Sequence, residues 1–207
     1  ASEVVFDKTP KDYQKFIAMI ESDILRIENI ITDYSAMIKD EARLSITEAK
    51  IFNIKKLVAE IISEYEKLNK IKIKFVFITD NTANNKFDIK GQASFLRQAI
   101  QNIIDNAISF SKPEDKITIN LSSTNNYISL SMSDNGPGIK EPIFEKIFER
   151  FYSLRDEVDT MKIHSGLGLN IAKQIIDAHQ GYISANNLQG NGGIIGARFI
   201  INLPIAK

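Results

Sequence analysis

The sequence has no cysteine and only two histidines among its 207 residues. Disulfides and thiolate chemistry are therefore excluded, which fits a cytosolic location. His164 and His179 stand 15 residues apart without cysteine, so we expect no zinc site. No apolar run of 18 residues and no signal peptide are present, and we expect that this chain itself does not span a membrane.

Net charge is also absent, because 26 basic side chains balance 26 acidic ones. This balance argues against nucleic acid as the main partner, since nucleic-acid-binding domains usually carry a basic surplus. Hydrophobic residues make up 43 % of the chain and charged residues 25 %, which is ordinary for a globular protein with a sizeable core. The length allows one large domain, or a small domain with an appendage.

Residues 12–40 are predicted to form one long helix, followed by a polar linker at 40–50. Apolar side chains recur every three or four residues, at Phe16, Ile20, Ile24, Ile27, Ile31, Tyr34 and Ile38. This spacing is close to the 3.5-residue period of a helix in a bundle. No second helix of this period follows, so the partner surface is expected from another copy of the chain or from sequence outside it. The alternative is a core helix folded onto the next domain.

The pattern after the linker is that of an α/β domain. Helices are expected at 53–65, 94–110, 143–152 and 167–179, and strands at 71–77, 87–89, 117–121, 127–132, 182–187 and 198–203. Because the strands come mostly in hairpins with helices between them, we predict an α+β fold. It would be a two-layer α/β sandwich in which helices cover one face of a mixed sheet, preceded by the long amphipathic helix.

A sharp turn follows the strand at 127–132, in the stretch Ser-Asp-Asn-Gly-Pro-Gly-Ile at 133–139. Gly136 and Gly138 allow positive φ and a close approach of the backbone to a ligand. Asp134, at the strand end, can accept a hydrogen bond from an amino group held in an apolar pocket. By itself the stretch is also compatible with a strand-to-helix connection that binds no ligand.

Asn102 and Asn106 are four residues apart and lie on one face of the predicted helix at 94–110. Their side-chain oxygens suit a hard cation such as Mg²⁺ that bridges phosphates. The alternative is that the two amides tie down neighbouring loops.

A polar, aperiodic segment at 153–165 is predicted to be a lid or binding loop. It leads to Gly166-Leu167-Gly168-Leu169, where glycines open a helix. The free N–H groups and the positive dipole end of such a helix form a phosphate cradle.

Taken in the order of the chain, the two asparagines, the Asp-Asn-Gly-Pro-Gly turn, the predicted lid and the glycine-rich helix start resemble the ATP-binding domain of the GHKL superfamily, with its Bergerat-type fold. Within it, the chain resembles a bacterial two-component sensor histidine kinase over residues 50–205. The long helix resembles the second helix of that family's dimerisation and phosphotransfer domain. We therefore divide the chain into 1–45, a partial dimerisation and histidine-phosphotransfer region, and 46–207, an ATP-binding catalytic domain. Residues 1–10 would be the end of the first helix and its loop.

The resemblance implies roles for the residues of a nucleotide site. Asn106 would ligate Mg²⁺, and Asn102 would support the phosphate end of ATP. Asp134 would accept from the adenine amino group. The other expected members are Phe110 near sugar and base, Gly136, Gly138 and Ile139 in the adenine pocket, Phe148 and Phe151 at the lid base, Arg150 as a candidate phosphate contact, and Gly166, Leu167, Gly168 and Leu169 around the phosphates.

Three departures from the family pattern matter. Ser109 stands where the family has lysine, which removes a cationic phosphate contact, and His164 stands where glycine is frequent and is read as a solvated lid residue. His179 is expected to be structural and favoured at a helix end by the dipole. Neither histidine lies in the His-Glu or His-Asp context of a phosphoacceptor. We therefore predict that the chain binds ATP and Mg²⁺ but does not autophosphorylate on histidine.

Position 102 separates two activities within the superfamily. The ATPase members have a water-activating glutamate there, whereas an amide has no useful basicity. The predicted function is transfer of the ATP γ-phosphate to a histidine outside this chain and then to a response-regulator aspartate. The full-length protein would be a homodimer, and this chain would be the cytoplasmic part of an inner-membrane sensor. A GHKL-type ATPase and a degenerate nucleotide-binding dimerisation scaffold remain the alternatives.

Overall fold

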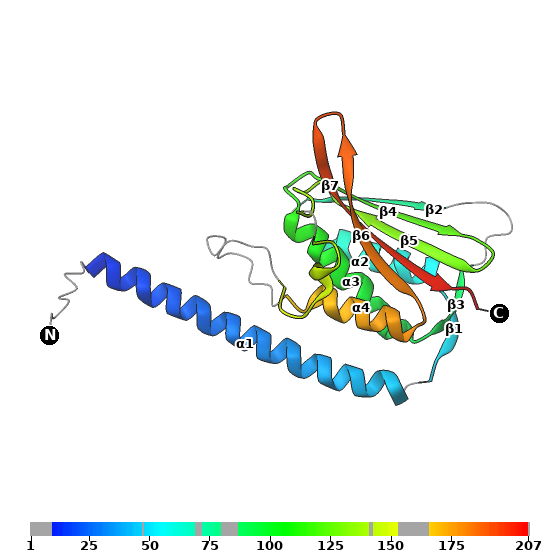
Figure 1. The fold of residues 1–207 in the computed structure, drawn as a ribbon, viewed down its shortest axis with the longest axis horizontal. Helices are drawn as coiled ribbons and strands as arrows, with labels where there is room; N and C mark the ends of the chain where they lie inside the picture. The colour runs from blue at the N-terminus through cyan, green and yellow to red at the C-terminus, as the bar shows by residue number, and fades with distance from the viewer. Residues whose placement is uncertain are drawn as a thin grey trace.

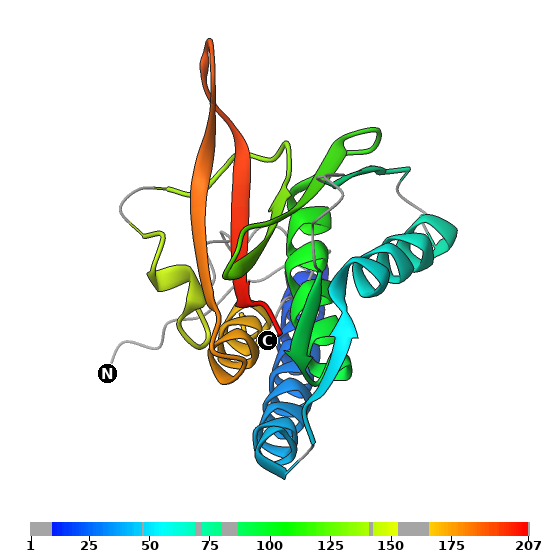
Figure 2. The same ribbon diagram turned by 90° about the vertical axis from the view of Figure 1, so that its right-hand side faces the viewer.

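The computed structural model describes residues 10–46, 48–68, 72–79, 87–140, 143–152 and 166–206. A long helix, α1, leads into an α/β part in which a helix layer lies between α1 and a sheet (Figures 1 and 2). Two predictions lie outside the described residues: the remnant of a first helix before Pro10, and the lid at 153–165 with His164.

Helix α1 spans Pro10–Ile46 and is longer than expected. The predicted polar linker is wrong over residues 40–46, because this segment lacks proline and glycine and continues the helix. The seven apolar side chains of its predicted stripe are between 39 and 59 % exposed, so the alternative of a core helix is also wrong. No helix in the described part of the chain is long and apolar enough to cross a membrane.

The main sheet has five strands in the order β2-β4-β5-β7-β6. Its strands are β2 (Lys74–Thr79), β4 (Lys116–Ser123), β5 (Tyr127–Ser133), β6 (Tyr182–Gly190) and β7 (Gly193–Pro204). Strands β2 and β4 pair in parallel and all other neighbours are antiparallel, so the predicted mixed sheet and its two hairpins are confirmed. The β6–β7 hairpin projects beyond the other strands (Figures 1 and 2).

A second, two-stranded sheet joins β1 (Lys50–Asn53) to β3 (Asp88–Gly91). Strand β1 was not predicted, since four residues carry no readable periodicity. Asn53 at its end caps the next helix, because its Oδ1 accepts a hydrogen bond from the Lys56 N–H at 3.2 Å.

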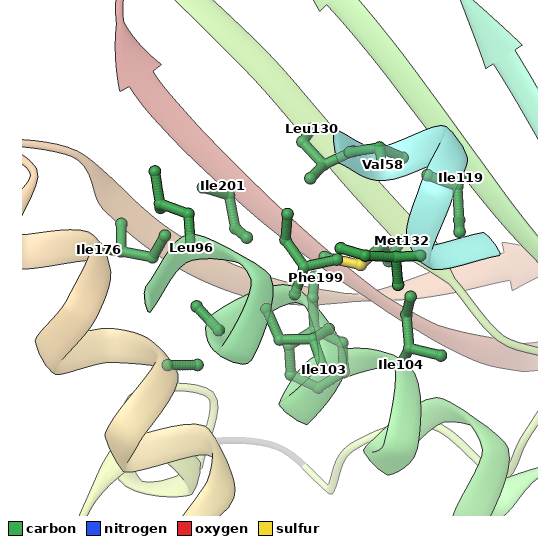
Figure 3. Packing of buried hydrophobic residues seen from close by; sticks show 14 of the residues in the cluster. Val58, Leu96, Ile103, Ile104, Ile119, Leu130, Met132, Ile176, Phe199 and Ile201 are labelled. Atoms are coloured by element: carbon green, nitrogen blue, oxygen red, sulfur yellow. The ribbon is translucent and has the colours of Figure 1, made fainter. Parts of the chain in front are cut away.

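Three helices cover one face of the main sheet: α2 (Ile54–Leu68), α3 (Ala93–Phe110) and α4 (Gly168–Ala178). The core fills the space between the two layers (Figure 3). Its side chains come from the inner faces of these elements, with Val58 on α2, Ile103 and Ile104 on α3, and Met132 and Phe199 on the strands. Burial of this apolar surface at about 25 cal/mol per Å² is the main force that holds the layers together.

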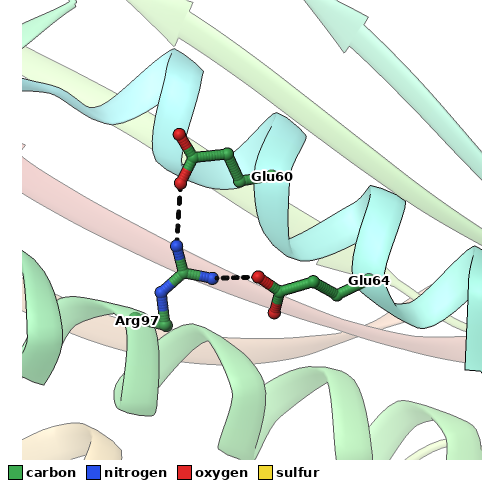
Figure 4. Close-up of polar contacts among 3 residues, drawn as sticks. All are labelled: Glu60, Glu64 and Arg97. Atoms are coloured by element: carbon green, nitrogen blue, oxygen red, sulfur yellow. Dashed lines mark hydrogen bonds and ion pairs between the residues drawn. The ribbon is translucent and has the colours of Figure 1, made fainter.

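Helices α2 and α3 are also joined by polar contacts. The Arg97 guanidinium on α3 binds the Glu60 carboxylate at 2.8 Å and the Glu64 carboxylate at 3.0 Å (Figure 4). The Tyr65 hydroxyl donates to Asp105 Oδ1 at 2.7 Å. The glutamates are largely exposed, so each ion pair stabilises the fold by no more than about 1 kcal/mol. Together these contacts fix the orientation of α3.

The helix predicted at 143–152 is wrong. The structure has only a single 3₁₀ turn, η1 (Lys146–Phe148), and Phe151 has a positive φ of 62°. Phe148 instead turns its ring into the core, edge-on to Phe199 with centroids 6.4 Å apart. Tertiary packing of this aromatic ring therefore outweighs the local helical pattern.

Candidate functional site

Helix α3 carries two asparagine side chains that lack partners within the described residues. Asn102 has a buried Nδ2 with no hydrogen bond. Asn106 is half-buried, and no described group forms a hydrogen bond with its side chain; its main-chain carbonyl accepts from Ser109 Oγ at 2.7 Å. Buried amides are normally satisfied. The two side chains are thus free to bind a ligand, and the alternative that they tie down described loops has no support.

The first turn of α4 lies beside Asn102. A Cβ built on Gly168 would lie 3.8 Å from the Asn102 Cβ. The preceding residue, Leu167, is fully buried and offers no side-chain acceptor to the first N–H groups of α4, and Leu169 is half-buried in the same turn. The positive end of α4 and the free Asn102 amide therefore form a corner suited to an anion.

Asp134 lies at the end of β5 and is 4 % exposed. Its Oδ1 accepts from Gly136 N–H at 2.8 Å and from Ala197 N–H at 3.1 Å. No described group donates to Oδ2. Burial raises the pKa of the Asp134 carboxyl above its ordinary value, although the two backbone donors act in the opposite direction. One oxygen is thus fixed by the backbone and the other is left to accept from a ligand.

Close backbone packing surrounds this carboxylate. A Cβ on Gly136 would lie 3.0 Å from the carbonyl oxygen of Phe110, so the turn packs on the C-terminal end of α3. Gly196 on β7 faces the Asp134 carbonyl so closely that any Cβ would overlap it. Phe110 is 38 % exposed and lies next to the turn.

Asn187 on β6 holds the far end of the same turn and was not predicted. Its Oδ1 accepts from Ile139 N–H and its Nδ2 donates to Ile139 C=O, both at 2.7 Å. Ile139 itself is 7 % exposed. No local pattern marks this contact, because a single asparagine at the end of the predicted strand 182–187 has many explanations.

The two phenylalanines predicted at the lid base lie in different environments. Phe148 lies in the core, whereas Phe151 is 52 % exposed and contacts Tyr34 of α1 with ring centroids 6.4 Å apart. Arg150 is exposed. Gly166 has a φ of 71°, and a Cβ there would lie 3.0 Å from the Tyr152 carbonyl oxygen. The described residues on either side of 153–165 are therefore in contact.

Asn170 on α4 is a further residue that sequence reasoning missed. Its Nδ2 donates to the Phe148 carbonyl at 2.8 Å, which ties the aromatic turn to the helix that begins at Gly168.

His179 is structural, as predicted, but for a different reason. It is 7 % exposed; its Nε2 accepts from Gln92 N–H at 3.0 Å and its Nδ1 lies 2.7 Å from the Ile175 carbonyl. These contacts require the neutral Nδ1–H tautomer. Burial lowers the pKa of His179, which favours the neutral ring, so its two hydrogen bonds and its burial hold it at the helix end rather than the helix dipole.

The site has two ends along α3. The end with Phe110 and Asp134 can accept an amino group, and the end with Asn102, Asn106 and Gly168 can accept an anion. Asn102 and Phe110 are eight residues apart on the helix, a separation of about 12 Å. The arrangement suits an elongated ligand with a base at one end and phosphates at the other.

Comparison with known proteins agrees with this geometry. The solved catalytic domain of histidine kinase ThkA superposes with a TM-score of 0.64 and 30 % identity, covering 76 % of this chain and 98 % of that one. The class is thus that of histidine kinase catalytic domains, and the predicted α+β fold is confirmed. Residues 91–207 match the family described as histidine kinase-, DNA gyrase B-, and HSP90-like ATPase, and the chain belongs to this family.

The curated relatives are sensor proteins. Sensor protein ChvG of Rhizobium meliloti is 34 % identical over 197 residues, which are 92 % of this chain and 34 % of the relative. ChvG of Agrobacterium fabrum is 33 % identical over 206 residues, which are 97 % of this chain and 35 % of the relative. The chain thus spans about a third of the length of these relatives. The resemblance to a two-component sensor histidine kinase is confirmed.

A longer solved structure includes the region of α1. ThkA in complex with the response regulator protein TrrA matches 96 % of this chain and 53 % of that one, with a TM-score of 0.69 and 27 % identity.

Proposed function

We propose that residues 46–207 bind ATP with Mg²⁺ and transfer its γ-phosphate to a histidine outside this chain, as the catalytic part of a sensor histidine kinase. The observation that carries the proposal is the pairing of a fixed carboxylate, Asp134, in the turn that packs on Phe110, with the unpartnered amides of Asn102 and Asn106. On α3, Asn102 lies about two turns before Phe110 and Asn106 about one turn before it. This separation fits adenine at one end and the phosphates at the other.

At the adenine end, Oδ2 of Asp134 accepts the exocyclic amino group. Guanine has a carbonyl oxygen at this position, which a second acceptor repels, so the site selects adenine. Phe110 and Ile139 supply apolar surface beside the base.

At the phosphate end, Asn102 donates from Nδ2 and the first turn of α4 offers its N–H groups to the phosphate oxygens. Asn106 holds Mg²⁺ through its side-chain oxygen. The described residues contain no group of three or more acidic or histidine side chains that could hold a metal ion. A hard cation held mainly by water and phosphates fits a site with a single amide oxygen. The metal supplies charge neutralisation when it is bound.

The chain contributes position and electrostatics to the reaction rather than a general base. The acceptor histidine attacks the γ-phosphorus with a ring nitrogen, an N–P bond forms, the P–O bond to ADP breaks, and ADP leaves. An amide at position 102 gives water no base at that place, which protects ATP from hydrolysis. The Asn102 donor and the α4 start stabilise the charge on the transferring group.

The parent protein would then pass the phosphoryl group to an aspartate of a response regulator. The complex of ThkA with TrrA supports a partner of this kind. The exposed apolar stripe of α1 supports assembly with a second copy and with the phosphoacceptor helix. We place the chain as the cytoplasmic part of a membrane-anchored sensor, which the sensor proteins among its relatives support.

The test is ATP binding by calorimetry with and without Mg²⁺, followed by phosphoryl transfer in trans to a phosphoacceptor domain from the parent protein. Binding with transfer is expected. Hydrolysis without transfer would indicate an ATPase. Neither transfer nor hydrolysis would indicate a degenerate scaffold. The chain alone should gain no acid-labile phosphate, and such phosphate would contradict the prediction that it does not autophosphorylate.

A further inference from the structure

The turn at 134–139, which we call the nucleotide loop, is attached to the β6–β7 hairpin at both ends. At its start, Asp134 exchanges hydrogen bonds with Ala197 of β7. At its end, Ile139 exchanges hydrogen bonds with Asn187 of β6. Asn187 and Ala197 are themselves paired across the hairpin. One pair of strand residues therefore holds both ends of the loop.

Asn187 satisfies both backbone groups of Ile139 with one side chain. The two bonds are 2.7 Å long and join residues 48 positions apart. Among short side chains only an amide offers a donor and an acceptor side by side, and it reproduces the pairing of a neighbouring strand. Without Asn187 these two groups, on a residue that is only 7 % exposed, would have no partner among the described residues.

The local backbone is shaped around this contact. The pairing of β6 with β7 shifts register one residue beyond Asn187, between Leu188 and Gln189. Such irregularities re-aim side chains at the margins of sheets. On the loop side, Gly138 has a φ of 77°, and a Cβ there would lie 2.8 Å from Asn187 Oδ1. Only glycine lets the loop approach the asparagine this closely.

We propose that Asn187 is a positioning residue for nucleotide binding, which holds the nucleotide loop in its binding geometry before ATP arrives. This inference rests on the proposed function. A loop fixed in advance loses little conformational entropy when the base binds. Because Asn187 acts at the adenine end, it should affect ATP and ADP equally and leave transfer from bound ATP unchanged.

The test compares Asn187→Ala with Asn186→Ala. Asn186 is the adjacent, exposed residue with no described contact to the loop, so it is a matched control. Asn187→Ala should weaken binding of both ATP and ADP about ten-fold, since two hydrogen bonds are lost. The rate of phosphoryl transfer at saturating ATP should equal that of the unsubstituted chain. Asn187→Asp keeps the acceptor for the Ile139 N–H but loses the donor to its carbonyl, and should not restore affinity.

Hydrogen exchange of the Ile139 amide measures the hydrogen bond between the nucleotide loop and Asn187 in the nucleotide-free protein. It should be slow in the parent and in Asn186→Ala, and fast in Asn187→Ala at a temperature where the rest of the sheet stays protected. Fast exchange at Ile139 in the parent would overturn the inference even if Asn187→Ala failed to fold.

Two binding results would also overturn it. If the parent binds ATP and a folded Asn187→Ala protein binds it equally well, Asn187 has no positioning role, whereas the proposed function stands. If the parent binds no ATP, the proposed function fails, and a role of Asn187 in nucleotide binding fails with it.

Discussion

Asp134 and Ala197 are joined by two hydrogen bonds, one through the backbone and one through the carboxylate. The Asp134 N–H donates to the Ala197 carbonyl at 3.0 Å, and the Ala197 N–H donates to Asp134 Oδ1 at 3.1 Å. Asp134 thus continues the β5–β7 ladder with its main chain, and its carboxylate binds the same neighbouring residue of β7. The free oxygen of the carboxylate is held in one place, and the predictions for base recognition depend on this.

Replacing Asp134 with Asn should weaken ATP binding about 100-fold and leave the fold intact. The amide oxygen can still accept from Gly136 and Ala197, but an NH₂ group then faces the adenine amino group, and a hydrogen bond to a charged group is lost. Calorimetry with ATP and GTP is the measurement, and the ratio of affinities should shift towards GTP. The exposed Asp177→Asn is the control. Unchanged ATP affinity in Asp134→Asn would remove the residue from this role.

Replacing Asn106 with Ala should weaken only the Mg²⁺-dependent part of ATP binding. The side chain has no described partner, so its removal costs little stability, and the lost metal ligand should lower affinity for ATP with Mg²⁺ about ten-fold. Titrations with Mg²⁺ and with EDTA separate the two parts. Gln101→Ala, on a different face of α3, is the control. An equal loss with and without Mg²⁺ would contradict metal ligation by Asn106.

The fold is predictable from the sequence wherever the apolar period is long. Leu57, Val58 and Ile61 on α2, and Ile100 and Ile104 on α3, recur at helical spacing and are buried as expected. The prediction fails where tertiary packing decides. Phe148 belongs to the run at 143–152 that was predicted to be helical. Its ring packs instead on Phe199, a residue distant in the sequence, and only a single 3₁₀ turn forms.

The site shows the same division. Asp134, Gly136 and Gly138 are near neighbours in the sequence, so their chemistry follows from one short stretch of residues. Asn187 and Asn170 act on backbone atoms of residues 48 and 22 positions away, and nothing local marks them. For His179 the sequence predicts only a structural residue favoured at a helix end by the dipole, because its two hydrogen bonds and its burial become visible only in three dimensions.

Replacing Asn102 with Ala should lower ATP affinity without destabilising the protein. Its Nδ2 is buried without a hydrogen bond, so the folded chain already bears the desolvation cost of that group, of the order of 1 kcal/mol. Removing the group should leave the melting temperature equal to that of the parent or slightly higher, while a phosphate donor is lost. Thermal melting and ATP titration are the two measurements. A clear drop in melting temperature would show that the amide is satisfied in the free protein.

The stability of the fold should depend on His179 below neutral pH. Burial depresses the folded-state pKa below the ordinary value of 6.5, so between these two values the unfolded chain binds a proton that the folded chain does not. The stabilisation is therefore complete above about pH 6.5 and is lost as the pH falls towards the folded-state pKa. Protonation would also break the hydrogen bond that Nε2 accepts from Gln92 N–H.

Urea unfolding of the parent and of His179→Gln at pH 7.5 and pH 5.5 measures this dependence. Carboxylates titrate in both proteins, so the difference between them isolates the histidine. The parent should lose more free energy of unfolding between the two pH values than His179→Gln does, because the glutamine amide cannot be protonated. Equal losses would mean that His179 titrates alike in the folded and unfolded states, which its burial between α4 and Gln92 argues against.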